Sequence, residues 1–530
     1  MRMAMRALPF AFIVLSASSW CAVTASPPNI VMIVSDDLGF NDVGFHGSTQ
    51  IPTPNIDEIA HTGVTLNHYH VQPVCSPTRA TFMSGRHVIH TGIYMPFPQG
   101  TPLRLNLSYT LLPEYLKNLG YSTHMVGKWH LGQNVLRALP TGRGFETYFG
   151  YWSGAEDYYS HECVGAYDLA EGTRTAFEYS GTYSTPLWTA KAVEVIERSR
   201  NNTAPFFLYL AYQNVHWPLE APAQYMARFE HNTGGDHRRQ AVAAMVAVMD
   251  EGIGNVTAAL KRNGLWETTL LIFSTDNGGP TNGNEGTSSN NFPMRGGKNT
   301  LWEGGTRGVA AVRGAGIERS QIGSVLYAKV HAADWLPTLV RVASGGDDWH
   351  KHVPAHEPPY LLGDGIDVWD QISKAASPVR TEILHECHAP DDKDQVHGNA
   401  LTVGDWKIVQ FGSVHPADEA GWHPPPGQDP STQKYQLRCD ISKQPAVVDP
   451  DECVHSFCLF NVTQDPCEYV NQASAHPDVV AQLVARLAIY QATAVPSVQN
   501  DGCRPVVSQG AWRPCDAPDP AGVALKGIYV

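Results

Sequence analysis

Residues 29–37 read NIVMIVSDD: an apolar, β-branched run that ends directly at two acids, Asp36 and Asp37. Such a run predicts a buried strand of a sheet. The pattern returns in residues 268–277, TTLLIFSTDN, where a second apolar run ends at an acid and an amide. Ligands in open α/β sheets bind beyond the carboxyl ends of the strands. We therefore expect the polar residues behind both runs to line one cleft.

Those polar residues are Asp36, Asp37, Asp276 and Asn277. Carboxylates held this close repel one another, and a hard divalent cation such as Ca²⁺ or Mg²⁺ would offset that repulsion. The sequences Asp-Asp-Leu-Gly and Asp-Asn-Gly-Gly are also good turn sequences. From spacing alone, a metal site and a pair of simple turns both stay open.

Further strands and helices follow from the apolar pattern along the chain. Residues 121–130 and 205–213 also have the pattern of buried strands, whereas residues 53–63 and 237–264 have apolar residues at helical spacing. Alternating strands and helices predict an α/β fold. After about residue 395 the pattern changes to a new set of strands, a Pro-rich loop and a late helix. We expect one domain over residues 26–395 and a smaller one over residues 396–530.

The first 25 residues have the pattern of a signal peptide: two Arg, a short apolar run and small residues before a cleavage site. No later run of about 18 uninterrupted apolar residues predicts a membrane span. The formal net charge of −14 argues against a general nucleic-acid binder. Entry into the secretory pathway also fits four Asn-x-Ser/Thr sites, at Asn106, Asn201, Asn255 and Asn461.

The cysteines also fit a secreted protein with disulfide bonds. Of ten Cys, Cys21 leaves with the signal peptide, so nine remain and at least one has no intramolecular partner. Six crowd near the C-terminus, which predicts a small disulfide-bonded domain: Cys439, Cys453, Cys458, Cys467, Cys503 and Cys515. Cys75 stands far from them and is our candidate for the unpaired residue.

Cys75 opens the segment CSPTRATFMSGR. Pro77 suits the first turn of a helix, which would place Cys75 at a helix N-terminus, where the dipole favours an anion. Arg79 lies one helical turn further and can reach back towards Cys75. A reactive group beside an anion site and a merely buried cysteine are the two interpretations.

This segment resembles the Cys-x-Pro-x-Arg signature of the type I sulfatases, with Gly85-Arg86 following it. Other motifs of that family follow in order along the chain. They contain Asp36-Asp37, Lys128 and His130 in GKWHLG, His216 in HWPLEAP, Asp276-Asn277, and Lys298 in RGGKNTLWEGG. Within the family, THMVGKWHLG, GYWSGAEDYYSH and LWEGGTRGV look most like the arylsulfatase B (N-acetylgalactosamine-4-sulfatase) group.

The resemblance implies an alkaline-phosphatase-like fold: a large mixed sheet flanked by helices, plus a smaller C-terminal α+β domain. It implies that a formylglycine-generating enzyme oxidises Cys75 to Cα-formylglycine, whose hydrated aldehyde attacks the sulfur of a sulfate ester. The implied ligands of one Ca²⁺ are Asp36, Asp37, Asp276, Asn277 and the modified Cys75. The implied catalytic residues are Cys75, Arg79, Lys128, His130, His216 and Lys298.

The implied activity is hydrolysis of aryl sulfates and of sulfated glycans such as N-acetylgalactosamine 4-sulfate, by a secreted or lysosomal protein. Two alternatives stay open: a phosphatase or phosphodiesterase of the alkaline-phosphatase superfamily, and a secreted matrix protein that binds sulfated polysaccharide without cleaving it. The short loop around Asp465-Pro466, with the resemblance, predicts a Cys458–Cys467 bridge. Cys503–Cys515 is a second expectation, on proximity alone.

Overall fold

The structure, a computed structural model, describes residues 27–355, 363–389, 396–412, 419–432, 434–499 and 502–517. The predicted signal peptide, with Cys21, lies outside the described residues.

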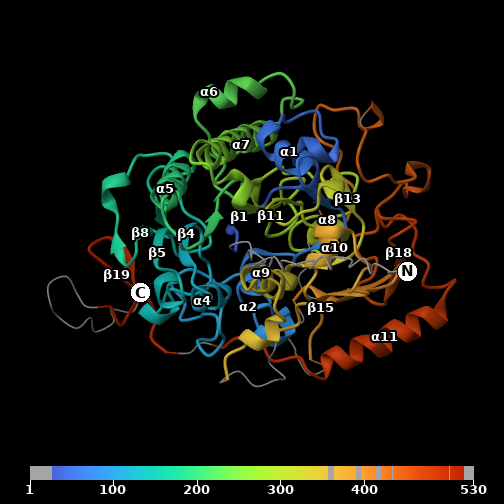
Figure 1. Ribbon diagram of the computed structural model, residues 1–530. Coiled ribbons are helices and arrows are strands. Elements are labelled where there is room, and N and C mark those ends of the chain that lie inside the picture. Colours follow the sequence, from blue (N-terminus) through green and yellow to red (C-terminus); the bar gives the residue numbers. More distant parts are fainter. Residues whose placement is uncertain are drawn as a thin grey trace, which may run out of the picture.

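A ten-stranded mixed sheet forms the centre of the molecule (Figure 1). In spatial order its strands are β13 (Ser324–Leu326), β2 (Val64–Leu66), β12 (Ala310–Gly314), β11 (Thr269–Thr275), β1 (Asn29–Ser35), β10 (Phe206–Ala211), β4 (Ser122–Gly127), β5 (Thr147–Tyr151), β8 (Leu169–Glu171) and β9 (Arg174–Thr175). Strand β1 lies between β10 and β11 and is parallel to both. Four predicted strands are thus confirmed, and they form one contiguous block from β11 to β4.

Helices cover both faces of this sheet. Figure 1 shows α7 and α1 on one side of β1 and β11, and α9 and α2 on the other. The helices of the first face are α1 (Pro54–His61), α5 (Ser184–Ser199) and α7 (His237–Arg262); those of the second are α2 (Cys75–Ser84), α4 (Leu112–Asn118) and α9 (Trp335–Ala343). Along β1, Met32 packs into the second face and the neighbouring Ile33 into the first, as strand alternation requires. The predicted α/β fold is confirmed.

Helix α7 is, among the described residues, the one helix long and apolar enough to cross a membrane by length and composition. Its most apolar window is 72% buried inside the protein. The side chain of Asp236 caps its N-terminus by accepting from the backbone N–H groups of Arg238 and Arg239. Helix α7 is therefore a core helix that covers the sheet.

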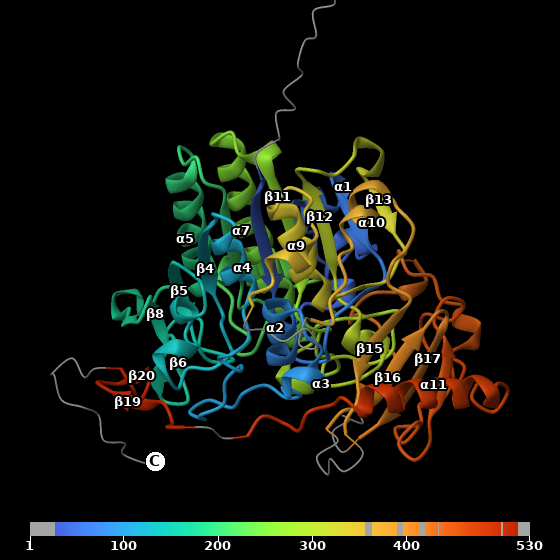
Figure 2. The same ribbon diagram turned by 60° about the horizontal axis from the view of Figure 1, so that its bottom comes forward.

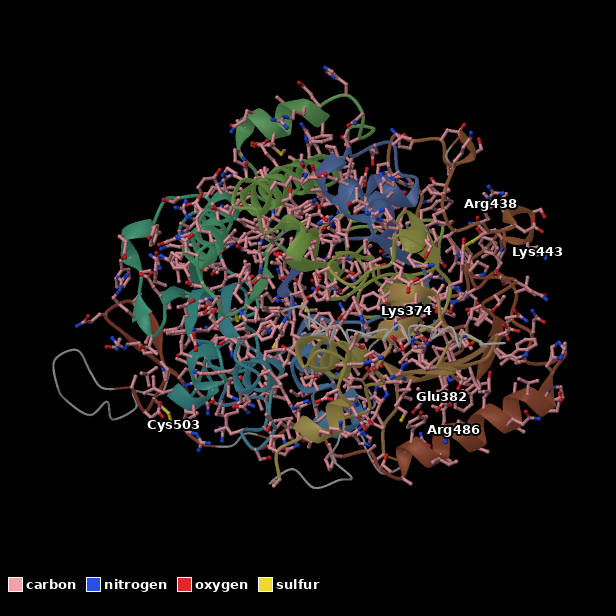
Figure 3. The ribbon with its side chains drawn as sticks, in the orientation of Figure 1. Lys374, Glu382, Arg438, Lys443, Arg486 and Cys503 are labelled. Carbon is pink, nitrogen blue, oxygen red and sulfur yellow. A yellow bond between two sulfur atoms is a disulfide. The ribbon has the colours of Figure 1, made fainter. Side chains whose placement is uncertain are left out.

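A second, four-stranded sheet consists of β15 (Glu382–Glu386), β16 (Gly398–Val403), β17 (Trp406–Phe411) and β18 (Cys458–Asn461). Helix α11 (Pro477–Gln491) packs on it, and Arg486 of α11 donates to Glu382 of β15 over 3.0 Å (Figure 3). The expected division between residues 395 and 396 falls between β15 and β16, which are paired neighbours. The first strand of this sheet therefore lies before the expected boundary and the other three lie after it. The division into two domains stays a prediction.

The chain after α11 returns to the far end of the main sheet. Strand β19 (Val506–Ser508) pairs with β20 (Ala511–Arg513), and β20 pairs with β7 (Ala166–Tyr167), in a separate small sheet. Figure 2 shows β19 and β20 at one end of the molecule and β15 to β17, with α11, at the other. The last described residues therefore belong by strand pairing to the first part of the chain.

The disulfides differ from the predicted pairing, and the Cys458–Cys467 prediction is wrong. The bridges are Cys439–Cys467, Cys453–Cys458 and Cys503–Cys515. Cys458 starts the extended strand β18, so the chain runs away from it instead of turning back towards Cys467.

The Cys503–Cys515 pairing is confirmed, and so is the prediction that Cys75 is in no bridge. Cys163 and Cys387 are free as well. The described residues therefore contain three bridges, and not the four that eight paired cysteines would give.

Candidate active site

The ends of β1 and β11 bring the predicted acids together. Ser35 and Thr275 are paired neighbours in the sheet, so the next residues, Asp36 and Asp276, emerge side by side. The backbone N–H of Asp37 donates to Asp276 Oδ1 over 3.4 Å. Carboxylate oxygens of the three Asp lie within 4.8 Å of one another, and all three side chains are fully buried.

Cys75 is the first residue of α2, which ends at Gly85 in the left-handed region (φ 65°). Its Sγ lies 3.6 Å from Asp36 Oδ1, so α2 points its N-terminus at the acid cluster. Burial raises the pKa of the Cys75 thiol. The unmodified side chain is therefore a neutral thiol and a poor nucleophile.

Three buried cations balance the three acids. Lys128 Nζ lies 2.6 Å from Asp36 Oδ2, and Lys298 Nζ lies 3.0 Å from Asp37 Oδ2. The third cation is Arg79, whose Nε and Nη2 both reach Asp276 Oδ2, at 2.9 and 2.7 Å. Each buried acid is therefore paired with a buried cation.

These pairs set the charge state of the acids. Burial favours the neutral form of Asp37, but Lys298 and His216 outweigh it and hold its pKa below the usual value. Burial opposes ionisation of Asp276 as well, and Arg79 reverses the balance in the same way, so its pKa is also lowered. At Asp36, burial wins and raises the pKa well above the usual value. Asp36 therefore gains most from a further positive charge.

The two predicted histidines lie in different environments. His216 Nε2 lies 3.8 Å from Asp37 Oδ2, and its side chain is 13% exposed. His130 is buried, and its Nε2 lies 3.1 Å from the carbonyl oxygen of Phe97. Burial and then Lys128 hold the pKa of His130 well below its usual value. A neutral His130 that donates from Nε2 leaves Nδ1 as an acceptor, and Nδ1 has no hydrogen-bond partner among the described residues.

Asn277 supplies the test of whether a metal ion fits. Its Nδ2 donates to Asp37 Oδ1 over 2.7 Å, whereas its Oδ1 is buried and has no hydrogen-bond partner in the described part of the chain. A buried carbonyl oxygen without a partner, beside three carboxylates, is the kind of donor set that a hard cation such as Ca²⁺ prefers. The residues present therefore fit such an ion.

Two residues at the site were missed by sequence reasoning. Glu285 Oε2 lies 2.6 Å from Lys298 Nζ, at the solvent side of the cluster. Glu419, from beyond the second sheet's hairpin, accepts from the backbone N–H of Thr281 over 2.6 Å and so anchors the loop that carries Glu285. The only local signal is a Gly-rich turn around Glu285, and no local signal exists for Glu419.

Known proteins have similar sequences and a similar fold. The family model described as Sulfatase matches residues 28–345. Arylsulfatase J of Mus musculus is 37% identical over 515 residues, covering 92% of this chain and 80% of that protein. N-acetylgalactosamine-6-sulfatase of Mus musculus is 32% identical over 366 residues, covering 63% of this chain and 68% of that protein.

Solved structures agree with the sequence relatives. The crystal structure of Ps i-CgsB in complex with k-i-k-neocarrahexaose matches with a TM-score of 0.70 and 26% identity, covering 90% of this chain and 95% of that one. PsFucS1 sulfatase from Pseudoalteromonas sp. has the same fold, with a TM-score of 0.67 and 22% identity over 90% of this chain and 93% of that one. The expected large mixed sheet flanked by helices, with a smaller sheet beside it, is confirmed.

The finer assignment to the arylsulfatase B group is not tested by these matches and stays a prediction. The coarser assignment rests on a family match over more than half of the chain and on a relative aligned along nearly all of it. The chain belongs to the sulfatase family and is a sulfuric ester hydrolase.

Proposed function

We propose that this sulfatase hydrolyses aryl sulfates and sulfated glycans such as N-acetylgalactosamine 4-sulfate, through a formylglycine at position 75 and one Ca²⁺. The observation that carries the proposal is the position of Cys75 at the buried N-terminus of α2, 3.6 Å from Asp36. A glycan substrate is supported by the names of two similar proteins, N-acetylgalactosamine-6-sulfatase and Ps i-CgsB in complex with k-i-k-neocarrahexaose.

The residues that would hold Ca²⁺ are Asp36, Asp37, Asp276, Asn277 and the modified residue 75. When bound, the ion would act as a Lewis acid on a sulfate oxygen. Arg79 keeps the carboxylate of Asp276 ionised and fixed in place, because both of its donors reach the same oxygen. The positions of these oxygens are thus fixed by the chain's own ion pairs.

Position 75 would supply the nucleophile. The hydrate of formylglycine has two hydroxyls: one attacks sulfur, and the other, once deprotonated, collapses to the aldehyde and releases sulfate. His130 is our candidate for the partner of this hydrate, since its Nδ1 is a free acceptor in the neutral tautomer. Biosynthesis would require a formylglycine-generating enzyme as a partner.

The buried cations Lys128 and Lys298 would bind the sulfate group. Lys128 and Lys298 are fully or almost fully buried, so their attraction for an anion is screened little by solvent. Lys298 and His216 both face Asp37 and are our candidates to protonate the leaving oxygen. Donors placed where charge develops stabilise the transition state more than the bound ester.

The test is the mass of the tryptic peptide that contains residue 75, together with a turnover assay on a small aryl sulfate. Conversion of Cys to formylglycine lowers the mass by about 18 Da, since SH₂ is replaced by O. We expect the lighter peptide in protein made in a host that has the modifying enzyme. The turnover rate should rise in proportion to the fraction of protein that carries the lighter peptide. An active protein whose peptide keeps the full mass of Cys would refute the formylglycine mechanism.

Glu285 gives a further prediction. Its carboxylate forms an ion pair with the ammonium group of Lys298, so a sulfate ester must compete with Glu285 for that group. We expect Glu285→Gln to lower KM for a small aryl sulfate by about 2–5-fold, the size of a partly exposed ion pair. Glu178→Gln is the control, because Glu178 is also exposed and paired with a cation, Arg174, outside the site. A rise in KM would show instead that Glu285 binds the substrate.

We also propose that the protein enters the secretory pathway and becomes secreted or lysosomal. Three disulfides support this, since such bridges persist in oxidising compartments. Three of the four glycosylation sequences, at Asn106, Asn201 and Asn255, are exposed, whereas Asn461 is only 8% exposed. The first three are therefore the sites that we expect to carry glycans.

A further inference from the structure

A large cavity lies away from the candidate active site. It measures about 1500 Å³ and lies between the edge of the main sheet, near β2 and β13, and the C-terminal segment of residues 430–441. None of the proposed catalytic or metal-binding residues lines it. Ligand sites for small molecules measure about 300–1000 Å³, so this cavity has room for more than one sugar unit.

The charged groups of this cavity are mainly positive. Lys329, Lys434 and Arg438 line it, against one described acid, Asp405. Asp405 accepts a hydrogen bond of 2.7 Å from Thr463, and no carboxylate in the described ranges lies within 4 Å of the three cations in an ion pair. The chain as a whole has a net charge of −14, so this concentration of positive charge runs against its composition.

The pKa of Lys329 is lowered in this cavity. Burial lowers the pKa of its ammonium group, and the more distant Asp405 only partly opposes the shift. A half-buried cation without a close counter-charge gains free energy when an anion binds beside it. The cavity is thus suited to an anionic ligand.

Aromatic side chains accompany the cations. Tyr327 is 64% exposed, and its ring stands edge-on to His68 at 6.5 Å. Tyr435, which also lines the cavity, packs against Phe292 at 5.3 Å between ring centroids. Rings combined with a few charged groups suit a ligand that has both apolar faces and negative groups. A sulfated sugar chain has both, because each pyranose ring has an apolar face and each sulfate a negative charge.

We propose that this cavity is a second binding site for sulfated polysaccharide, which holds one stretch of a chain while another sulfated unit is cleaved at residue 75. The inference rests on the proposed glycan substrate. Lys329, Lys434 and Arg438 contact sulfate groups, and Tyr327 packs on a sugar ring. The site raises affinity for polymers by adding a second contact to the same chain, and leaves small substrates unaffected.

The test compares two substrates in the full-length enzyme: chondroitin 4-sulfate chains and a small aryl sulfate. We expect the double variant Lys434→Glu/Arg438→Glu to raise KM for the polymer by about 10-fold, from two reversed charges, with kcat and the kinetics of the aryl sulfate unchanged. Tyr327→Ala, at an exposed position, should also raise only the polymer KM.

Lys443→Glu is the matched control. Figure 3 shows Lys443 near Arg438 on the same side of the molecule, but Lys443 pairs with Asp440 at 3.6 Å and does not line the cavity. An unchanged polymer KM in the double variant would overturn the proposal, and so would an equal rise in Lys443→Glu, which would show a diffuse charge effect.

Direct binding separates this proposal from the catalytic one. In a Cys75→Ala background, affinity electrophoresis in a gel that contains chondroitin 4-sulfate measures binding without turnover. We expect retardation that the double variant loses. A failure of the proposed catalytic function would leave this retardation intact, whereas equal retardation of both proteins, or equal retardation by DNA, would refute a polysaccharide site in the cavity.

Discussion

Cys75→Ala is expected to lower kcat for an aryl sulfate by about 10³-fold or more, the order of effect seen when an enzyme loses its nucleophile. The side chain is 1% exposed and small, and its hydrogen bond to Asp36, at 3.6 Å, is weak. Loss of one sulfur atom from the core should cost on the order of 1 kcal/mol in the free energy of unfolding. We therefore expect a folded, secreted and inactive protein, measured by thermal unfolding and by initial rates.

Cys387→Ala is the matched control, because Cys387 is also buried and free. It should retain full activity, since it packs in an apolar cluster with Leu384, Leu401 and Leu487 and does not lie at the acid cluster. Cys75→Ser adds a second comparison: a single hydroxyl could attack sulfur but could not expel sulfate, so turnover should stop after one cycle. Turnover by Cys75→Ala within about 10-fold of the wild type would contradict the assignment of the nucleophile.

The parts of the fold that sequence predicts are those fixed by local pattern. The apolar runs before Asp36 and Asp276 define β1 and β11, and pairing of Ser35 with Thr275 then places the acids together. The same reasoning finds the helix that starts at Cys75, since Pro77 marks its first turn. Lys128, His130, His216 and Lys298 were assigned by resemblance, because no local pattern distinguishes them from ordinary polar residues.

The parts that sequence misses depend on contacts between distant segments. Glu419 anchors Thr281 across 138 residues, and nothing near either residue indicates the other. The bridge from Cys439 to Cys467 was missed for the same reason: chain proximity favoured Cys458, but the extended strand β18 carries the chain away from it. Tertiary packing, not turn chemistry, selects the partner.

Asp276→Asn is expected to remove the proposed Ca²⁺ and, with it, the activity. The substitution keeps the shape of the side chain but removes one of three carboxylates that converge within 4.8 Å. Changes in residues that only support metal ligands cost about 10–100-fold in affinity, so loss of a charged ligand should cost about 100-fold or more. Metal analysis after dialysis, beside rates on an aryl sulfate, measures both effects.

The substitution also removes the charge of the carboxylate closest to the buried Arg79, which keeps only the 3.7 Å contact with Asp36, so destabilisation alone must be excluded. Asp334→Asn is the control, since Asp334 is equally buried and accepts from the buried Arg380 over 2.8 Å, outside the site. Both variants remove the charge of the carboxylate closest to a buried Arg and should lower the melting temperature. Only Asp276→Asn replaces a charged carboxylate ligand by a neutral amide, so only it should lose Ca²⁺. A folded Asp276→Asn protein with the wild-type Ca²⁺ content would show that Asp276 serves Arg79 and not the metal.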